Sequence, residues 1–244
     1  MYKLFLYFIL IIFFSACHTA KIKSQKYLVS PAPTELGTIG RATVGLDRSN
    51  GFEVRAVPKL SNNIRVSIEI VPYTNKLTKH FAKKAKFNQG QELVTIIDSL
   101  PHKPEVVTIR MLDIMGLVEE LNGGYNRDIL QLVNNINEAQ IITGVAVNLS
   151  VGALEKIKMA DAYYLKNDRP QQYSVALFKD GKFTETLAFR PEDIVAYQGS
   201  SFCWAIDEKG KAYLADLVQS NTDCKGKTKS YIKEKEKTEN LFKM

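Results

Sequence analysis

The chain has 244 residues, of which 45% are hydrophobic, 10% aromatic and 24% charged, which is the composition of a globular protein and excludes a wholly disordered chain. Its length suits one folded domain, or two small ones, with material for a core. The formal net charge of +7 is modest and spread along the chain, so solubility explains it and we expect no nucleic-acid partner.

The first residues have the features of a targeting segment. Lys3 precedes an apolar run from Leu4 to Phe14, which as a helix would span roughly 16 Å of a hydrocarbon core about 30 Å thick. This run is too short for a comfortable transmembrane helix. A positive start, a short apolar run and small residues at its end indicate a secretory signal peptide, which we place at residues 1–16.

The end of this run, Phe14-Ser15-Ala16-Cys17, resembles the lipobox of bacterial lipoproteins. The resemblance covers the targeting segment alone. It implies that Cys17 becomes the N-terminus and carries fatty acyl chains such as palmitate, and several chains hold a protein firmly to a membrane. The alternatives are an ordinary cleaved signal peptide and an uncleaved anchor. Because no acidic run follows Cys17, we expect an outer-membrane lipoprotein facing the periplasm.

Residues 17–36 show no apolar period and contain Ser30-Pro-Ala-Pro33, so we expect a lipidated N-terminus and a flexible tether there. Residues 37–224 are expected to form one α+β domain. Within it, Phe52–Val57 and Ile64–Val71 alternate apolar and polar residues, which predicts strands with one buried face.

The lysine-rich run Asn75–Phe87 has apolar residues at helical spacing. It is either a basic amphipathic helix on an anionic membrane or a solvated helix or loop over the sheet. Two stretches rich in β-branched residues follow, Leu93–Ile97 and Glu105–Leu112, and both predict strands.

Helices are expected in the middle of the chain. Ile114–Leu121 predicts a short helix that ends at a left-handed Asn122-Gly123-Gly124 stop signal. Asn126 is a candidate N-cap for a second helix over 127–137, which carries an apolar stripe. Residues 153–165 predict a third helix, because apolar residues recur there every three or four positions.

The rest of the domain is dominated by strands. Ile141–Val151 predicts a long buried strand, and two hairpins follow, one turning at Asp180-Gly181 and one around Glu208–Gly210. Residues 225–244 are mostly charged and predict a solvated helix or tail. The fold class is therefore α+β: mainly an antiparallel β-sheet or sandwich with one to three inserted helices.

Two cysteines remain if Cys17 is acylated. In an oxidising periplasm we expect Cys203 and Cys224 to form a disulfide, which closes a loop of about twenty residues and contributes about 3 kcal/mol. A metal site would need further ligands, yet His80 and His102 lie about a hundred residues away, so we predict no metal and no cofactor.

The only tryptophan, Trp204, stands beside one of these cysteines. We expect its ring to pack in the core next to the bridge. A sugar-stacking platform is the alternative, and it would require an exposed ring.

The polar segment 113–128 is the best place in the sequence for catalysis. Its weak catalytic candidates are Asp113, Glu119 and Glu120. Two carboxyl groups about 5 to 9 Å apart can cut a glycosidic bond. In the alternative interpretation both glutamates face solvent, Asn122 and Asn126 cap helices and the aspartate pairs with a neighbouring base such as Arg110.

Other catalytic patterns are weak. The Gly226-Lys-Thr sequence lacks the upstream glycine of a phosphate-binding loop, and the Ser-x-x-Lys pattern at 230–233 lies in the charged tail. The sequence therefore favours a lipid-anchored, non-catalytic binding or accessory subunit of an outer-membrane or periplasmic assembly, with a protein partner in the envelope. The alternative is an envelope glycan or peptide hydrolase that uses the carboxylates of segment 113–128.

Overall fold

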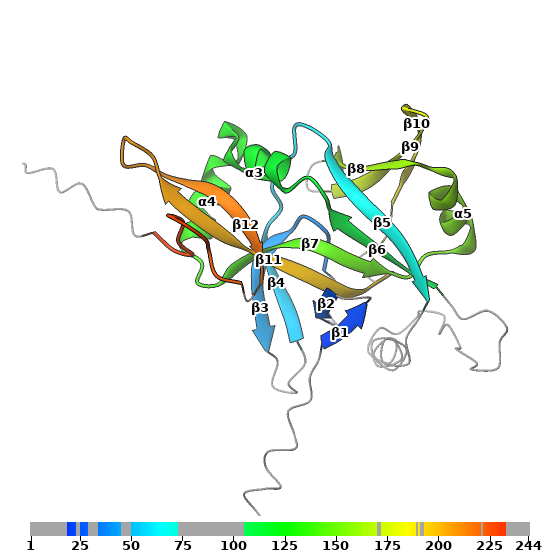
Figure 1. Cartoon of the computed structure of the whole chain (residues 1–244), viewed down its shortest axis with the longest axis horizontal. Coiled ribbons are helices and arrows are strands. Elements are labelled where there is room, and N and C mark those ends of the chain that lie inside the picture. The colour runs from blue at the N-terminus through cyan, green and yellow to red at the C-terminus, as the bar shows by residue number, and fades with distance from the viewer. Residues whose placement is uncertain are drawn as a thin grey trace, which may run out of the picture.

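The computed structural model describes residues 19–22, 25–28, 34–44, 50–72, 105–169, 172–188, 190, 193–220 and 222–232. In that part of the chain, twelve strands join in one sheet, and three α-helices and a 3-10 turn accompany it (Figure 1). The predicted class, α+β with a mainly antiparallel sheet, is confirmed. Residues 1–17, 75–87, 93–97 and 233–244 carry predictions that lie outside the described residues.

The strands are β1 (Thr19–Ile22), β2 (Gln25–Leu28), β3 (Ile39–Val44), β4 (Asn50–Ala56), β5 (Ile64–Pro72), β6 (Glu105–Met111), β7 (Ala139–Val147), β8 (Ala162–Arg169), β9 (Gln172–Lys179), β10 (Lys182–Leu187), β11 (Ile194–Ile206) and β12 (Ala212–Gln219). The helices are α3 (Ile114–Asn122), the 3-10 turn η1 (Gly124–Asn126), α4 (Arg127–Asn134) and α5 (Val151–Met159).

The sheet branches around its two central strands, β7 and β11. The main path runs β1-β2-β11-β7-β6-β5-β8-β9-β10. The first half of β7 pairs with β3 and its second half with β6, while β11 pairs with β7 along its first half and with β12 along its second. The β11–β12 hairpin therefore extends beyond the main path, and α3 packs against β12 (Figure 1).

The main core lies between one face of the sheet and the helices. The alternation predicted for β5 is seen at its start, where Ile64 and Val66 are buried and Arg65 is exposed. The strand predicted at 141–151 ends at Val147, and its residues from Ile141 onward are buried because both faces of the sheet are covered there. Ser150 then starts α5, since its hydroxyl accepts a hydrogen bond from the backbone N–H of Ala153.

Part of the predicted tether belongs to the sheet, so that prediction is wrong for residues 19–22 and 25–28. They form the β1–β2 hairpin, and Leu28 pairs with Tyr197 of β11. Tyr27 is only 1% exposed and packs in a second apolar cluster on the outer face of the sheet. Its partners there are Ile22, Val71, Val106, Ala146, Val195 and Ala196. Contacts with this apolar cluster hold the hairpin on the sheet. Its strands have only four residues each, which is too short for an alternating pattern to predict them from the sequence.

The third predicted helix, over 153–165, is also partly wrong. The helix α5 ends at Met159, and β8 starts at Ala162. Ala160 is already extended, with φ −86° and ψ 153°, and the next N–H donates to the carbonyl of Phe178. Tyr163 and Tyr164 then pair with β9, because aromatic side chains fit a strand.

The helix α3 ends at the predicted Asn122-Gly123-Gly124 sequence, but not through a left-handed glycine. Gly123 has φ −54°, so it is not left-handed. A glycine is needed there for space, because a Cβ atom would lie 2.6 Å from the ring of Tyr125. The predicted second helix ends at Asn134, three residues before its expected end.

Both predicted hairpins are confirmed. Asp180 and Gly181 have φ values of 49° and 73°, as a two-residue hairpin turn with the favoured twist requires. In the β11–β12 hairpin, Gly210 has φ 79° and the carboxylate of Asp207 accepts hydrogen bonds from the backbone of Lys209 and Lys211.

The start of the predicted C-terminal tail is packed against the domain. Lys229 exchanges two backbone hydrogen bonds with Trp204, and Ile232 is buried. The prediction of a solvated tail is therefore wrong for Ile232, whereas the side chains of residues 229–231 are exposed. None of the helices that the structure describes is long and apolar enough to cross a membrane.

Candidate functional site

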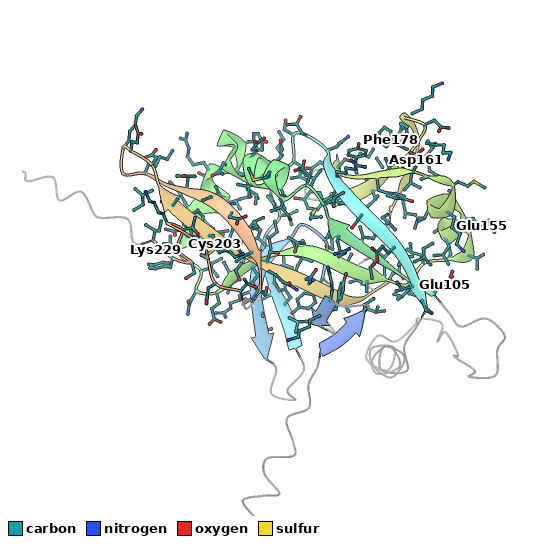
Figure 2. All side chains as sticks on the ribbon, viewed as in Figure 1. Glu105, Glu155, Asp161, Phe178, Cys203 and Lys229 are labelled. Carbon is teal, nitrogen blue, oxygen red and sulfur yellow. A yellow bond between two sulfur atoms is a disulfide. The ribbon has the colours of Figure 1, made fainter. Side chains whose placement is uncertain are left out.

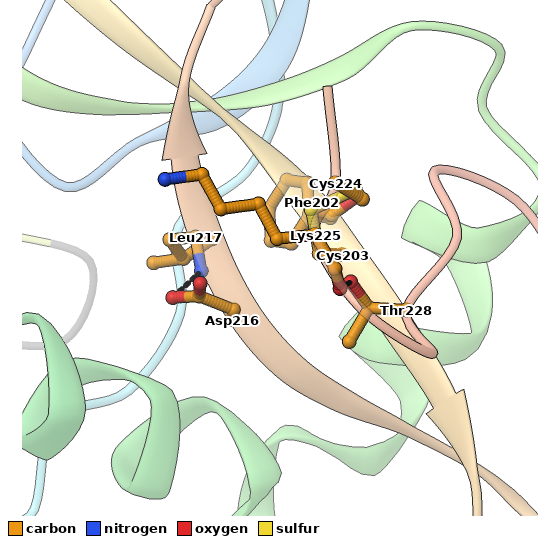
Figure 3. The surroundings of a disulfide bond; sticks show 7 residues. All are labelled: Phe202, Cys203, Asp216, Leu217, Cys224, Lys225 and Thr228. Carbon is orange, nitrogen blue, oxygen red and sulfur yellow. Dashed lines mark hydrogen bonds between the residues drawn. A yellow bond between two sulfur atoms is a disulfide. The ribbon is translucent and has the colours of Figure 1, made fainter. Parts of the chain in front are cut away.

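A disulfide joins Cys203 on β11 to Cys224 in the segment that follows β12 (Figure 3). Their Cα atoms lie 5.6 Å apart, which confirms the predicted bridge. Trp204 is 4% exposed and its ring stacks on that of Phe202, with 6.1 Å between centroids. The indole is thus a core side chain, as predicted, and it does not present the exposed face that a sugar-stacking platform needs.

An open groove of about 1160 Å³ lies between α4, the β11–β12 hairpin and the C-terminal segment. One face of α4 forms the first wall through residues spaced by three or four positions: Arg127, Leu130, Gln131 and Asn134. The hairpin forms the second wall, and Tyr231 and Ile232 close the third side. Figure 2 labels Cys203 and Lys229 next to each other, and Lys229 exchanges backbone hydrogen bonds with Trp204, the residue after Cys203.

The lining combines amide side chains with tyrosine rings. Tyr213 is 43% exposed and Tyr231 is 50% exposed. On the α4 side, Asn134 donates to the carbonyl of Ile232 at 3.2 Å, and its Oδ1 is buried without a hydrogen-bond partner in the described structure. Gln131 and Asn135 are exposed, and an amide offers both donors and an acceptor, so these two side chains can bind polar groups of either kind.

The charges in the groove do not form a catalytic pair. Arg127 and Lys211 are the cations of the lining, and Asp207 is its acidic residue. The Oδ1 of Asp207 already accepts two backbone hydrogen bonds within the hairpin. No histidine, cysteine or serine is among the residues that line the groove.

Two of the three predicted catalytic carboxylates stabilise the fold instead. Asp113 caps α3, because its Oδ1 accepts from the N–H of Gly116 at 2.8 Å. Glu120 lies at the other end of that helix and is only 6% exposed, so the interpretation that it faces solvent is wrong. Glu119 is exposed, as that interpretation expected.

Glu120 is the centre of a hydrogen-bond network. Its carboxylate accepts from the backbone N–H of Ser61, from the side chain of Asn62 at 2.6 Å and from the hydroxyl of Tyr125 at 2.7 Å. Burial alone would raise the pKa of Glu120, but these hydrogen bonds outweigh it and the pKa is lowered. A glycosidase acid needs a raised pKa, so the arrangement does not favour the hydrolase hypothesis.

Asn126 binds backbone groups rather than capping a helix with its side chain. It is fully buried, and its side chain exchanges two hydrogen bonds of 2.8 Å with the backbone of Lys59 and donates a third, of 2.9 Å, to the carbonyl of Glu120. It occupies the N-cap position of α4 without a side-chain capping bond, so the capping prediction is wrong.

Asn122 has the same role on the other side of α3. Its side chain donates to the carbonyl of Leu214 at 2.8 Å and accepts from the N–H of that residue at 3.1 Å. It also donates to the carbonyl of Val118 at 3.0 Å. The two asparagines thus attach α3 to β12 and to the chain before β5, and thereby position two walls of the groove.

No protein-family model matches this sequence, and a search of curated proteins finds no relative. The described part of the chain contains no group of three or more His, Cys, Asp or Glu side chains placed to hold a metal ion. The groove is therefore the candidate functional site. Sequence reasoning missed it, because its walls come from segments about 80 to 100 residues apart, and no local pattern joins them.

Proposed function

We propose that this protein is a lipid-anchored, non-catalytic protein of the bacterial cell envelope that holds an extended segment of a protein partner in the groove beside α4. The lining of the groove supports this role. Its amides and exposed tyrosines suit binding, and its one acidic residue is engaged in the hairpin turn. The lipobox at Cys17 supports the anchor, on an outer membrane and facing the periplasm.

The shape and chemistry of the groove favour a chain over a small molecule. Its volume of about 1160 Å³ exceeds the range of roughly 300 to 1,000 Å³ of small-molecule sites, and it is open. An extended peptide presents alternating carbonyl and N–H groups, which the exposed amides of Gln131 and Asn135 can pair with. Tyrosines such as Tyr213 and Tyr231 are common binding hot spots, because each buries a large ring at low entropic cost.

The groove is tested by comparing two surface changes. A photo-crosslinking residue at 213 or 231 should capture a defined envelope protein, and the same residue at Phe183, which is 55% exposed on the distant β9–β10 hairpin, should not. With the purified partner, the double variant Tyr213→Ala/Tyr231→Ala should bind at least about tenfold more weakly, since each hot-spot tyrosine contributes 1 kcal/mol or more. The control Phe183→Ala should bind like the wild type.

Equal affinity of the double variant and the wild type would contradict the groove as the binding site. If the wild type binds purified cell-wall glycan strands and the same double variant does not, the ligand of the groove is a glycan and not a protein segment. Glycan cleavage by the wild type would contradict the non-catalytic role.

The anchor is tested separately at Cys17. The change Cys17→Ala should abolish incorporation of a labelled fatty acid and release the domain, or leave its precursor uncleaved, because acylation and cleavage both need the thiol. The matched control is Ser15→Ala, which keeps a small residue in the lipobox and should stay labelled. Continued labelling of the alanine variant at position 17, measured by gel and by mass spectrometry, would exclude the lipoprotein assignment.

A further inference from the structure

We propose that the domain lies directly on the bilayer, with the β1–β2 hairpin and the neighbouring β3–β4 hairpin facing phospholipid headgroups. This inference rests on the acylation of Cys17 in the proposed function and is independent of the groove. Three observations lead to it: the length of chain between Cys17 and β1, the attachment of β1–β2 to the sheet, and the charge of both hairpins.

The covalent distance from the anchor to the domain is short. The strand β1 begins at Thr19, two residues after Cys17. Two peptide units span at most about 7 Å, even when fully extended. The acyl chains of Cys17 lie in the hydrocarbon core, so Thr19 stays within the headgroup region or at its surface.

The hairpin that begins at Thr19 is part of the folded domain. Ile22 and Tyr27 are 6% and 1% exposed in the apolar cluster on the outer face of the sheet. Burial raises the pKa of Tyr27 to about 12, as expected for a phenol removed from water. Leu28 pairs with Tyr197, whose hydroxyl donates to the carbonyl of Gly51 in β4. A short anchor on a fixed hairpin holds the whole domain at the membrane.

The two hairpins carry an excess of positive charge. Strands β1 to β4 contain four basic residues and a single acidic one, Glu53. Arg41 and Arg55 flank Glu53 at 2.9 and 2.8 Å, and the hydrogen bond from Arg41 is the main cause of its lowered pKa, so it stays ionised. Lys26 is exposed. Basic side chains at this position attract anionic headgroups.

Figure 1 shows β1–β2 and β3–β4 projecting from the same side of the molecule, whereas α3 and the β9–β10 hairpin lie on the opposite side. With the first side on the bilayer, the opposite side is turned toward the periplasm. The exposed residues Lys26 in β2 and Lys182 in β10 mark the two sides and serve as probe positions.

The test uses the acylated full-length protein, purified from membranes, with acylation of Cys17 first verified by mass spectrometry. A bio-orthogonal side chain placed at position 26 or 182 carries a fluorophore, and the protein is reconstituted in vesicles of phosphatidylglycerol and phosphatidylethanolamine with a headgroup-attached quencher. We expect quenching at position 26 to be at least threefold stronger than at position 182. Insertion of twelve Gly/Ser residues between His18 and Thr19 should reduce this difference.

Equal quenching at the two positions of acylated protein, or a difference that survives the insertion unchanged, would overturn this placement and leave the anchor intact. A Cys17 without acyl chains would overturn the anchor and the placement together. Neither result affects the groove, which the crosslinking experiment tests by itself.

Discussion

Replacing both Cys203 and Cys224 with alanine should lower the free energy of unfolding by about 3 kcal/mol, because the bridge closes a loop of about twenty residues. The bridge links β11 to the segment that carries Lys229, Tyr231 and Ile232, so its loss also frees one wall of the groove. Urea unfolding of wild type and double variant measures the difference.

The control for this experiment is the wild type unfolded in excess reductant, which should match the double variant under the same conditions. A free energy of unfolding that is the same with and without the bridge would show that the segment after β12 is held by its other contacts alone, chiefly the Lys229–Trp204 backbone bonds and buried Ile232.

The second large effect is expected at Glu120. The change Glu120→Gln should lower the free energy of unfolding by about 2 kcal/mol at neutral pH, because hydrogen bonds to a charged group contribute about 1.5 to 3 kcal/mol each. In addition, the NH₂ group of the new glutamine would face an N–H or O–H donor where the carboxylate oxygen accepted a hydrogen bond. The donors that lose the carboxylate are Ser61, Asn62 and Tyr125. The matched control on the same helix is Glu119→Gln, which is exposed and should change stability by less than about 0.5 kcal/mol.

The effect of Glu120 should depend on pH with a defined sign. Its pKa is lowered in the folded state, so its contribution is fully present above the unfolded value of about 4.3 and is lost as pH falls through the folded pKa. The difference between wild type and Glu120→Gln should therefore be constant from about pH 5 to 7 and shrink below about pH 4. Denaturant unfolding across this range measures it, and a difference that grows toward low pH would contradict the carboxylate role.

The sequence contained a signal for this buried glutamate that simple inspection missed. In a helix, Glu120 follows Leu117 by three residues and precedes Leu121 by one, so it lies at the side of the buried stripe. Glu119 lies on the opposite side. The helical period therefore predicts a buried position for Glu120 and an exposed one for Glu119, whereas an interpretation of the two glutamates as a pair gives both the same position.

Local chemistry explains which elements could be predicted. The Asp180-Gly181 turn needs positive φ at two residues, and the disulfide was expected from two cysteines and a predicted secretory signal, so both were readable from the sequence. The β1–β2 hairpin was not, because Tyr27 is fixed by a surface that strands from four other parts of the chain provide. The groove was missed for the same reason.

The hydrogen bonds between the Asn126 side chain and the Lys59 backbone constrain the two positions differently during evolution. Its side chain binds the main-chain groups of Lys59, which every amino acid except proline possesses in full. The exposed side chain at position 59 takes no part in these two bonds, and its own contact is the ring of Tyr125, whose centroid lies 5.7 Å from the ammonium nitrogen. Position 126, in contrast, requires one side chain that both donates and accepts at that length. Among descendants of this sequence, the lysine should be replaced often and the asparagine rarely, although the two residues form the same contact.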